Sequence, residues 1–327
     1  MKHTIPGEKD RQVLSEIREF LNALNNSGGK PMETMTPQEA RQVLIDAQKS
    51  VEVDTSGIAE TEREITQDGI DVNIHIIKPE HSKDQVLPVF MFIHGGGWVL
   101  GDYPTHKRLI RDLVVNSGAA AVFVDYTPSP DAHYPVAINQ IYAATKWVAE
   151  NGSEIGVDGK NMAIAGNSVG GNMTAVTCLM AKDKGGPEIK FQLLLWPVAD
   201  SDFSRESYEK YAEGRFLTTN MMKWMWDNYA PDTEKRNEYY ASPLKASLEK
   251  LKGLPPALVQ LAENDILHDE GLAYARKLDE AGVPVTIQTY NGFIHDYGLL
   301  NPLDHIEAVK FSSEQAALGL RKALFSW

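Results

Sequence analysis

The stretch MAIAGNSVGGNM, residues 162–173, decides the fold: an apolar run breaks into glycines around a single serine, Ser168. Gly166 stands two positions before this serine and Gly170 two positions after it. When a chain passes directly from a strand into a helix at a serine, the turn is so tight that side chains at these two positions would collide. Such a turn strains the serine backbone and leaves its hydroxyl exposed. The pattern therefore favours a nucleophilic serine over a purely structural glycine turn.

The sequence around this turn predicts an α/β fold. Residues 70–76 alternate apolar and polar side chains, as in a strand with one buried face. Short continuous apolar runs follow at 88–93, 119–126, 162–166, 191–196, 256–263 and 284–290. Helical stretches lie between most of these runs, and a last amphipathic segment extends from about 304 to 323. This alternation predicts a mostly parallel central sheet with helices on both faces and functional residues just past the carboxyl ends of its strands.

Two segments stand outside the alternation. Residues 1–50 predict helices, and the segment TPQEA has the residues of a helix start, with Thr36 as N-cap, Pro37 at the first helical position and Glu39 two positions later. Residues 200–235 are rich in aromatic residues and methionine, and we interpret them as an excursion over the sheet edge. Its apolar side chains either pack their own helix or line a pocket; they are Met221, Met222, Trp224 and Trp226.

Composition limits the possible partners. The chain has 327 residues and a formal net charge of -13, which disfavours nucleic acid and acidic membrane surfaces. Its single cysteine, Cys178, excludes an intrachain disulfide and a cysteine-based zinc site. The N-terminal residues lack the apolar stretch of a secretory signal, and the longest apolar run is too short to cross a bilayer. We therefore expect a cytoplasmic protein without membrane insertion.

A glycine-rich loop follows the apolar run at 88–93. The segment FIHGGGWVLGDY, residues 92–103, offers three consecutive glycines whose backbone N–H groups can approach a ligand closely. Donors of this kind stabilise the negative charge that develops on an attacked carbonyl oxygen. A phosphate cradle is the alternative, but the chain contains neither GxxxxGK[ST] nor GxGxxG, and Lys107 lies too far along the chain to complete a phosphate loop.

A serine nucleophile needs a base, and His295 is the candidate. It lies in YNGFIHDYG, just beyond the apolar run at 284–290, where a loop residue can reach across the carboxyl edge of the sheet toward Ser168. Asp265, directly after the run at 256–263, is the expected acid, with Asp269 as a rival one turn later. The other histidines considered fall in polar tails or turns, on the polar side of a strand, or in a helical stretch; they are His3, His81, His75 and His305.

The order Ser168, Asp265, His295 is the chain order of α/β-hydrolases. Together with HGGGW, GNSVGG, ENDILHDEG and GFIH, the segments VDYTPSPDAHYPVA and LPPALVQLAE resemble the hormone-sensitive-lipase-like family of α/β-hydrolases, mostly bacterial carboxylesterases. The resemblance covers roughly residues 70–327.

This resemblance implies roles for individual residues. It makes Ser168 the nucleophile, Asp265 the acid and His295 the base. The oxyanion donors would be the amides of Gly96, Gly97 and Val169. It also implies a domain organisation: a helical cap segment over residues 1–50, and a catalytic domain over residues 51–327 with a cap excursion at about 200–235. No cofactor is implied.

The chain departs from the family pattern beside two of these residues. The family usually has Asp and Ala flanking the serine, where this chain has Asn167 and Val169. Its histidine is commonly followed by Gly-Phe, where this chain has Asp296 and Tyr297. The backbone donor at Val169 does not depend on the side chain, but the isopropyl group could narrow the acyl pocket.

We therefore expect a serine carboxylesterase acting on small-molecule esters of short to medium acyl length. Hydrolysis of another acyl bond (amide, formamide, lactone or thioester) and acyl transfer to an alcohol stay open, because pocket shape and water access decide between them. A non-catalytic receptor on the same fold would be favoured by a broken triad, whereas all three residues are present. The family resemblance also allows a homodimer through an edge strand or a terminal helix.

Overall fold

The computed structural model describes residues 11–325. Their strands form one sheet of eight, in the order β1-β2-β4-β3-β5-β6-β7-β8. The strands are β1 Ile58–Gln67, β2 Ile70–Pro79, β3 Leu87–Ile93, β4 Ala120–Asp125, β5 Val157–Asn167, β6 Gln192–Leu195, β7 Ala257–Asn264 and β8 Val285–Ile294. β2 pairs antiparallel with β1 and β4, and all the other neighbours are parallel. The predicted mostly parallel sheet is confirmed.

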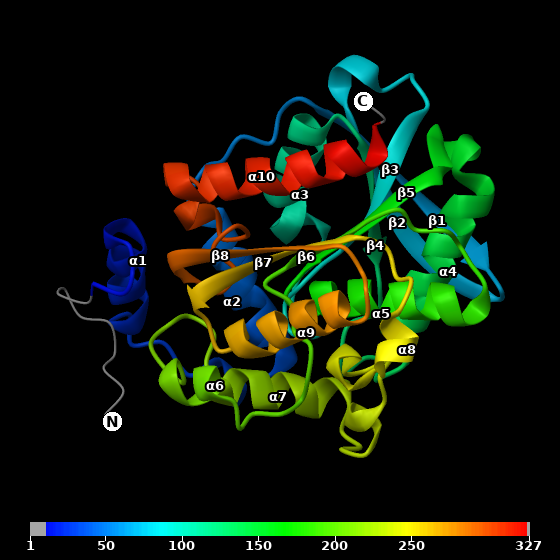
Figure 1. The fold of residues 1–327 in the computed structure, drawn as a ribbon. Coiled ribbons are helices and arrows are strands. Elements are labelled where there is room, and N and C mark those ends of the chain that lie inside the picture. Colours follow the sequence, from blue (N-terminus) through cyan, green and yellow to red (C-terminus); the bar gives the residue numbers. More distant parts are fainter. Residues whose placement is uncertain (1–10, 326–327) are drawn as a thin grey trace.

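Helices cover both faces of this sheet (Figure 1). The α-helices are α1 Ser15–Asn25, α2 Pro37–Lys49, α3 Tyr103–Ser117, α4 Val136–Asn151, α5 Val169–Lys184, α6 Glu206–Lys210, α7 Thr219–Tyr229, α8 Leu248–Leu251, α9 His268–Glu280 and α10 Glu307–Leu324. Short 3-10 turns lie at η1 Met32–Thr34, η2 Glu80–Ser82, η3 Gly152–Ile155, η4 Lys235–Asn237, η5 Pro243–Lys245 and η6 Asn301–Leu303. Helices α3 and α10 lie together on one face, and α4, α5 and α9 lie on the other (Figure 1).

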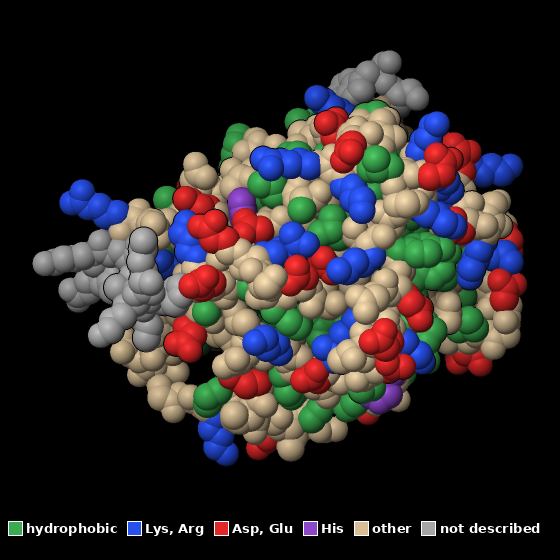
Figure 2. Space-filling model, turned by 60° about the horizontal axis from the view of Figure 1, so that its bottom comes forward, with side chains coloured by type: hydrophobic (Ala, Val, Ile, Leu, Met, Phe, Trp, Pro, Cys, Tyr) green, Lys and Arg blue, Asp and Glu red, His purple; other side chains and the backbone are tan. Residues whose placement is uncertain are grey.

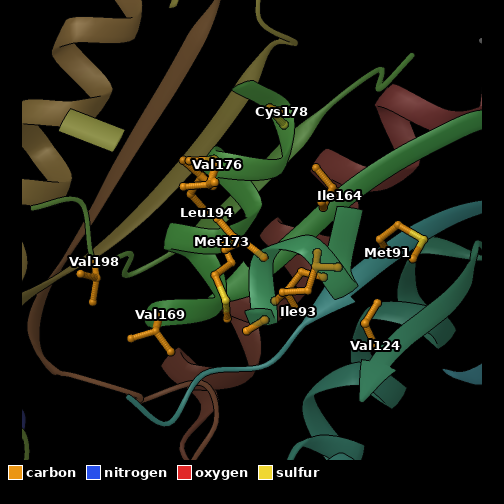
Figure 3. Packing of buried hydrophobic residues seen from close by; sticks show 14 of the residues in the cluster. Met91, Ile93, Val124, Ile164, Val169, Met173, Val176, Cys178, Leu194 and Val198 are labelled. Atoms are coloured by element: carbon orange, nitrogen blue, oxygen red, sulfur yellow. The ribbon is translucent and has the colours of Figure 1, made fainter. Parts of the chain in front are cut away.

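Each face of the sheet has its own hydrophobic core, as the alternation of side chains along β3 shows. Phe90 and Phe92 pack into the cluster that includes apolar residues of α3 and α10. Val89, Met91 and Ile93 point the other way, into the cluster with α4, α5 and α9. Figure 3 shows part of this second cluster, where side chains of β3, β5 and α5 meet. A strand buried on both faces explains the continuous apolar runs of the sequence.

Parallel pairing decides where the functional loops lie. β5, β6, β7 and β8 are consecutive neighbours and run in the same direction. The loops after these strands, and after β3 beside β5, therefore open at one edge of the sheet.

The described residues 11–50 and the excursion both contain helices, separated by turns and irregular segments. The predicted helix start is confirmed: Thr36 and Glu39 form a reciprocal capping box at α2, with Pro37 at its first position. The excursion contains α6 and α7, which lie below the sheet in Figure 1, on the side opposite α10. His3 lies outside the described residues.

Two boundaries differ from the sequence interpretation. β8 continues to Ile294, beyond the apolar run that ends at residue 290, because Tyr290 still pairs with Ala262 and Ile294 with Asn264. His305 does not lie in a helix, since α10 begins only at Glu307, after the 3-10 turn η6. His305 is exposed in this connection.

The surface carries charges of both signs. Figure 2 shows Lys and Arg side chains interspersed with Asp and Glu on the face that it presents. Among residues 11–325, no helix is long and apolar enough to span a membrane.

Candidate active site

Ser168 lies at the junction of β5 and α5. It is the N-cap of α5, with φ 56° and ψ -121°, a backbone conformation that L-residues rarely adopt. Its amide donates to the carbonyl of Leu195 at 2.8 Å, and its own carbonyl accepts from the amide of Val198 at 3.1 Å. The backbone strain predicted for this turn is present, and bonds to the end of β6 and to the loop after it hold the turn in place.

The two glycines around Ser168 leave no room for a side chain. A Cβ on Gly166 would meet the carbonyl oxygen of Gly170, and a Cβ on Gly170 would meet the carbonyl oxygen of Ile93. These are backbone atoms, which cannot turn aside as a flexible side chain can. The predicted reason for the glycine spacing is therefore confirmed.

The prediction that the hydroxyl is exposed is wrong: only 4% of the surface of Ser168 remains accessible. The side chain faces a buried histidine, and the loops after β6 and β8 pack around it.

The loops after β7 and β8 bring the other two candidates to this serine. Nε2 of His295 lies 2.9 Å from Oγ of Ser168. Nδ1 of the same ring lies 2.7 Å from Oδ2 of Asp265, whose Oδ1 accepts from the amide of Leu267 at 2.9 Å. The carboxylate thus requires the proton on Nδ1, which leaves Nε2 free to accept the serine proton.

Charges around His295 set its proton affinity. Burial alone would lower the pKa of this imidazole, but the carboxylates of Asp265 and Asp296 raise it above its ordinary value. His295 and Asp265 each keep only 2% of their surface accessible, so water screens their interaction little. An imidazolium at this position is therefore stabilised by the two carboxylates.

The rival acid, Asp269, lies in the first turn of α9. Its carboxylate accepts from the amide of Ser207 at 2.8 Å and lies 3.1 Å from Nδ1 of His268. These contacts tie α6 to α9, and no hydrogen bond joins Asp269 to His295. Of the two candidate acids, only Asp265 is hydrogen-bonded to His295.

The glycine-rich loop after β3 presents two free amides. The amide of Gly95 donates to Oδ1 of Asn167 at 3.0 Å. In the described part of the chain, the amides of Gly96, Gly97 and Val169 donate no backbone or side-chain hydrogen bond. Gly96 and Gly97 have φ of 99° and 64°, and a Cβ on Gly97 would collide with Met225 of α7. Their role as oxyanion donors stays a prediction.

No group of three or more His, Cys, Asp or Glu side chains within residues 11–325 is arranged to hold a metal ion.

A family model described as the alpha/beta hydrolase fold matches residues 90–299. The chain belongs to the α/β-hydrolase family. The crystal structure of a thermostable esterase from Pseudomonas putida ECU1011 is 60% identical, with a TM-score of 0.96, over 97% of this chain and 99% of that one. The carboxylesterase NlhH of Mycobacterium tuberculosis is 37% identical over 238 residues, 72% of this chain and 74% of that protein. An ethyl acetate hydrolase of Pseudomonas putida is 28% identical over 277 residues, 83% and 86% of the two chains. The resemblance to hormone-sensitive-lipase-like esterases is confirmed.

Two departures of this α/β-hydrolase from its family pattern contact each other. Nδ2 of Asn167 donates to Oδ1 of Asp296 at 3.1 Å, and Nε1 of Trp196 donates to the same oxygen at 2.7 Å. Oδ2 of Asp296 lies 3.8 Å from Nε2 of His295. The sequence marked both positions as unusual, but nothing in it showed that residues 129 positions apart meet.

His94, which precedes the three glycines, holds the start of the glycine loop. The sequence did not indicate this role. Its ring stacks on those of Phe123 and Tyr126, and burial lowers its pKa to about 4. Nδ1 lies 2.8 Å from the carbonyl of Gly95, and the hydroxyl of Tyr126 donates to the carbonyl of His94 at 3.1 Å. A neutral, stacked imidazole therefore fixes the start of the glycine loop.

Segments from both proposed cap regions contact the same loop. Arg41 of α2 donates through Nε to the carbonyl of Val99 at 2.8 Å and forms an ion pair with Asp131 at 2.8 Å. Trp98 stacks on Tyr229 of α7 with ring centroids 4.1 Å apart. Of the excursion residues singled out above, Met221, Met222 and Trp226 are buried in the cluster on this face, whereas Trp224 is partly exposed. Packing is thus an observed role of this helix.

Proposed function

We propose that this chain hydrolyses short- to medium-chain carboxylic esters through an acyl-enzyme on Ser168, with His295 as base and Asp265 as the residue that orients it. The general class, a serine ester hydrolase of the α/β-hydrolase family, follows from the family match and the esterase relatives. The observation that supports the detailed proposal is the continuous hydrogen-bond path from Asp265 through His295 to Ser168.

The geometry supports the following steps. Nε2 of His295 takes the proton of the Ser168 hydroxyl as Oγ forms a bond to the ester carbonyl carbon. The carbonyl oxygen becomes an oxyanion, which accepts hydrogen bonds from the amides of Gly96, Gly97 and Val169. The imidazolium then gives its proton to the leaving alcohol oxygen as the bond from carbon to that oxygen breaks. Water, deprotonated by the same imidazole, releases the acid from the acyl-enzyme and restores the serine.

Residues 1–50 and about 200–235 act in this proposal as a cap over the site. The contacts of α2 and α7 with the loop that carries Gly96 and Gly97 support this role. The side chain of Val169 is fully buried in the apolar cluster on this face, and short acyl groups stay the expected substrates. A small-molecule ester is the expected partner, while the homodimer and the cytoplasmic location stay predictions.

Initial rates on p-nitrophenyl esters of increasing acyl length test the proposal. We expect the highest kcat/KM on short acyl chains, and a fall of at least about 10⁴-fold in Ser168→Ala and in His295→Ala. A wild-type enzyme that is inactive on every ester, or a rate that Ser168→Ala leaves unchanged, would contradict it. Parallel assays on amide, thioester and lactone substrates separate the alternative acyl bonds.

A further inference from the structure

The family pattern usually places a carboxylate directly before the serine and glycine directly after the histidine. In this chain the carboxylate stands at Asp296 and an amide stands at Asn167, and the two side chains are hydrogen-bonded at 3.1 Å. Compared with the family pattern, this chain lacks the carboxylate before Ser168 and has a carboxylate after His295 instead.

The pair fixes the orientation of the Asn167 amide. Its Oδ1 must accept, because the partner is the amide N–H of Gly95 at 3.0 Å. Its Nδ2 must donate, because the partner is the carboxylate oxygen of Asp296. An aspartate at 167 could make the first bond but not the second, and it would place two carboxylates about 3 Å apart. Asparagine at 167 is therefore the residue that a carboxylate at 296 requires.

The backbone of Asp296 is strained, so we expect its side chain to make compensating interactions. Its φ is 56°, in the left-handed region that glycine adopts without strain and aspartate adopts only occasionally. The residue is only 7% accessible, and its Oδ1 accepts from both Asn167 and Trp196. Its Oδ2 faces Nε2 of His295 at 3.8 Å, on the side of the ring that contacts Ser168.

We infer that Asn167 and Asp296 form one positioning unit, which ties the loop of the oxyanion donors to the loop of the base and places a second carboxylate beside the imidazolium. The inference rests on the proposed function, because it assigns these residues to the same reaction. One end of the unit holds the amide of Gly95, the residue before the two proposed donors. The other end stabilises the proton on Nε2 until the leaving group takes it.

A double-mutant cycle on kcat tests the coupling between the loops. The variants are Asn167→Asp, Asp296→Gly and the double variant that restores the usual family pair. We expect each single variant to lower kcat by about 10-fold or more with a smaller change in KM, because the donors and the base lose their alignment. The kcat of the double variant should exceed the value expected from two independent effects by at least about 10-fold. Thermal unfolding of all four proteins identifies any variant that fails to fold.

The pH dependence tests the second carboxylate separately. Asp296→Asn keeps an oxygen that can accept from Asn167 and Trp196 but removes the charge. The other carboxyl groups near the ring, Asp265 and the buried Glu270, stay in place. The acid limb of the kcat/KM profile should move to lower pH. Asp183→Asn is the matched control, since it lies fifteen positions along α5 from Ser168, about 22 Å away, and it should leave the limb unchanged.

An NMR titration of the His295 ring in a Ser168→Ala background gives a readout that does not depend on activity. The proposal predicts a lower imidazole pKa when Asp296→Asn is added. An unchanged pKa, or single effects that simply multiply in the double variant, would overturn it. A wild-type enzyme inactive on all esters contradicts the proposed function instead, and the titration still decides whether Asp296 acts on His295.

Discussion

At the scale of single residues, the site depends on where protons are held. Oδ2 of Asp265 holds the proton of Nδ1, and Nε2 of His295 is thereby directed to Oγ of Ser168. The raised pKa of His295 means that a larger share of the enzyme carries an imidazolium near neutral pH. A protonated ring cannot accept the serine proton, so in the proposed mechanism the carboxylates that stabilise the imidazolium also reduce the active fraction at low pH.

The expected result is an acid limb of kcat/KM above pH 6.5, the ordinary value of histidine, because the pKa of His295 is raised. Activity should rise with pH through this limb. Asp265→Asn should move the limb to lower pH and reduce kcat by about 10⁴-fold, because the wrong tautomer is then favoured. Steady-state rates between pH 5 and 9 on a p-nitrophenyl ester, with product detected at a pH-independent wavelength, measure both effects.

Asp269→Asn is the matched control. It removes a carboxylate four positions away that contacts Ser207 and His268 but not the base. Its kcat should stay within about 3-fold of the wild type. A larger loss in Asp269→Asn than in Asp265→Asn would reverse the assignment of the acid.

At the scale of elements, the turn from β5 into α5 was readable from the sequence because its geometry excludes side chains. The spacing of Gly166 and Gly170 follows from backbone contacts. The strands were readable too, since both faces of the parallel sheet are buried and leave continuous apolar runs.

The end of β8 could not be predicted from the sequence, because residues 291–294 mix polar and apolar side chains and their pairing comes from the neighbouring strand β7. His305 was misplaced because amphipathic spacing continues through the turn before α10.

The close contact at the turn predicts how far one added methyl group lowers the free energy of unfolding. Gly170→Ala should lower the free energy of unfolding by about 1–3 kcal/mol or more, because its Cβ would meet the carbonyl of Ile93. Gly319→Ala in α10 is the matched control. Its Cβ would meet Leu258 Cδ2 at 3.1 Å, while the helix gains about 1 kcal/mol in propensity.

Urea unfolding followed by circular dichroism measures both glycine variants. The free energy of unfolding of Gly319→Ala should stay within about 1 kcal/mol of the wild type. Equal losses in the two variants would show that the turn is less constrained than its contacts indicate.

At the scale of the whole molecule, one buried carboxyl joins two parts of the fold. Glu270 of α9 is fully buried, and its Oε1 accepts from the amides of Ala199 at 2.8 Å and Asp200 at 3.4 Å. Burial raises its pKa to about 8. Near neutral pH the native protein therefore holds a proton here that the unfolded chain releases. Neither this role nor the pairing of Asn167 with Asp296 was readable from the sequence, because each depends on loops far apart in the chain.

The free energy of unfolding should accordingly fall as pH rises from 4.5 toward about 8. The contribution of this single group is at most roughly 1.4 kcal/mol per pH unit. Glu270→Gln imitates the protonated carboxyl and keeps its acceptor oxygen, so it should become more stable relative to the wild type as pH rises. Melting temperatures at pH 5, 7 and 9 measure this, with Glu280→Gln as a control at the exposed end of α9. Parallel curves for the wild type and Glu270→Gln would contradict the assignment.

The most direct test of the central claim is covalent capture of the nucleophile. The enzyme is incubated with a p-nitrophenyl alkylphosphonate, which forms a stable adduct with an activated serine, and the tryptic digest is then analysed by mass spectrometry. We expect one phosphonate per chain on residues 161–182, localised to Ser168 by fragmentation, and no adduct in Ser168→Ala. An adduct at another residue, or equal labelling of wild type and Ser168→Ala, would contradict the acyl-enzyme mechanism.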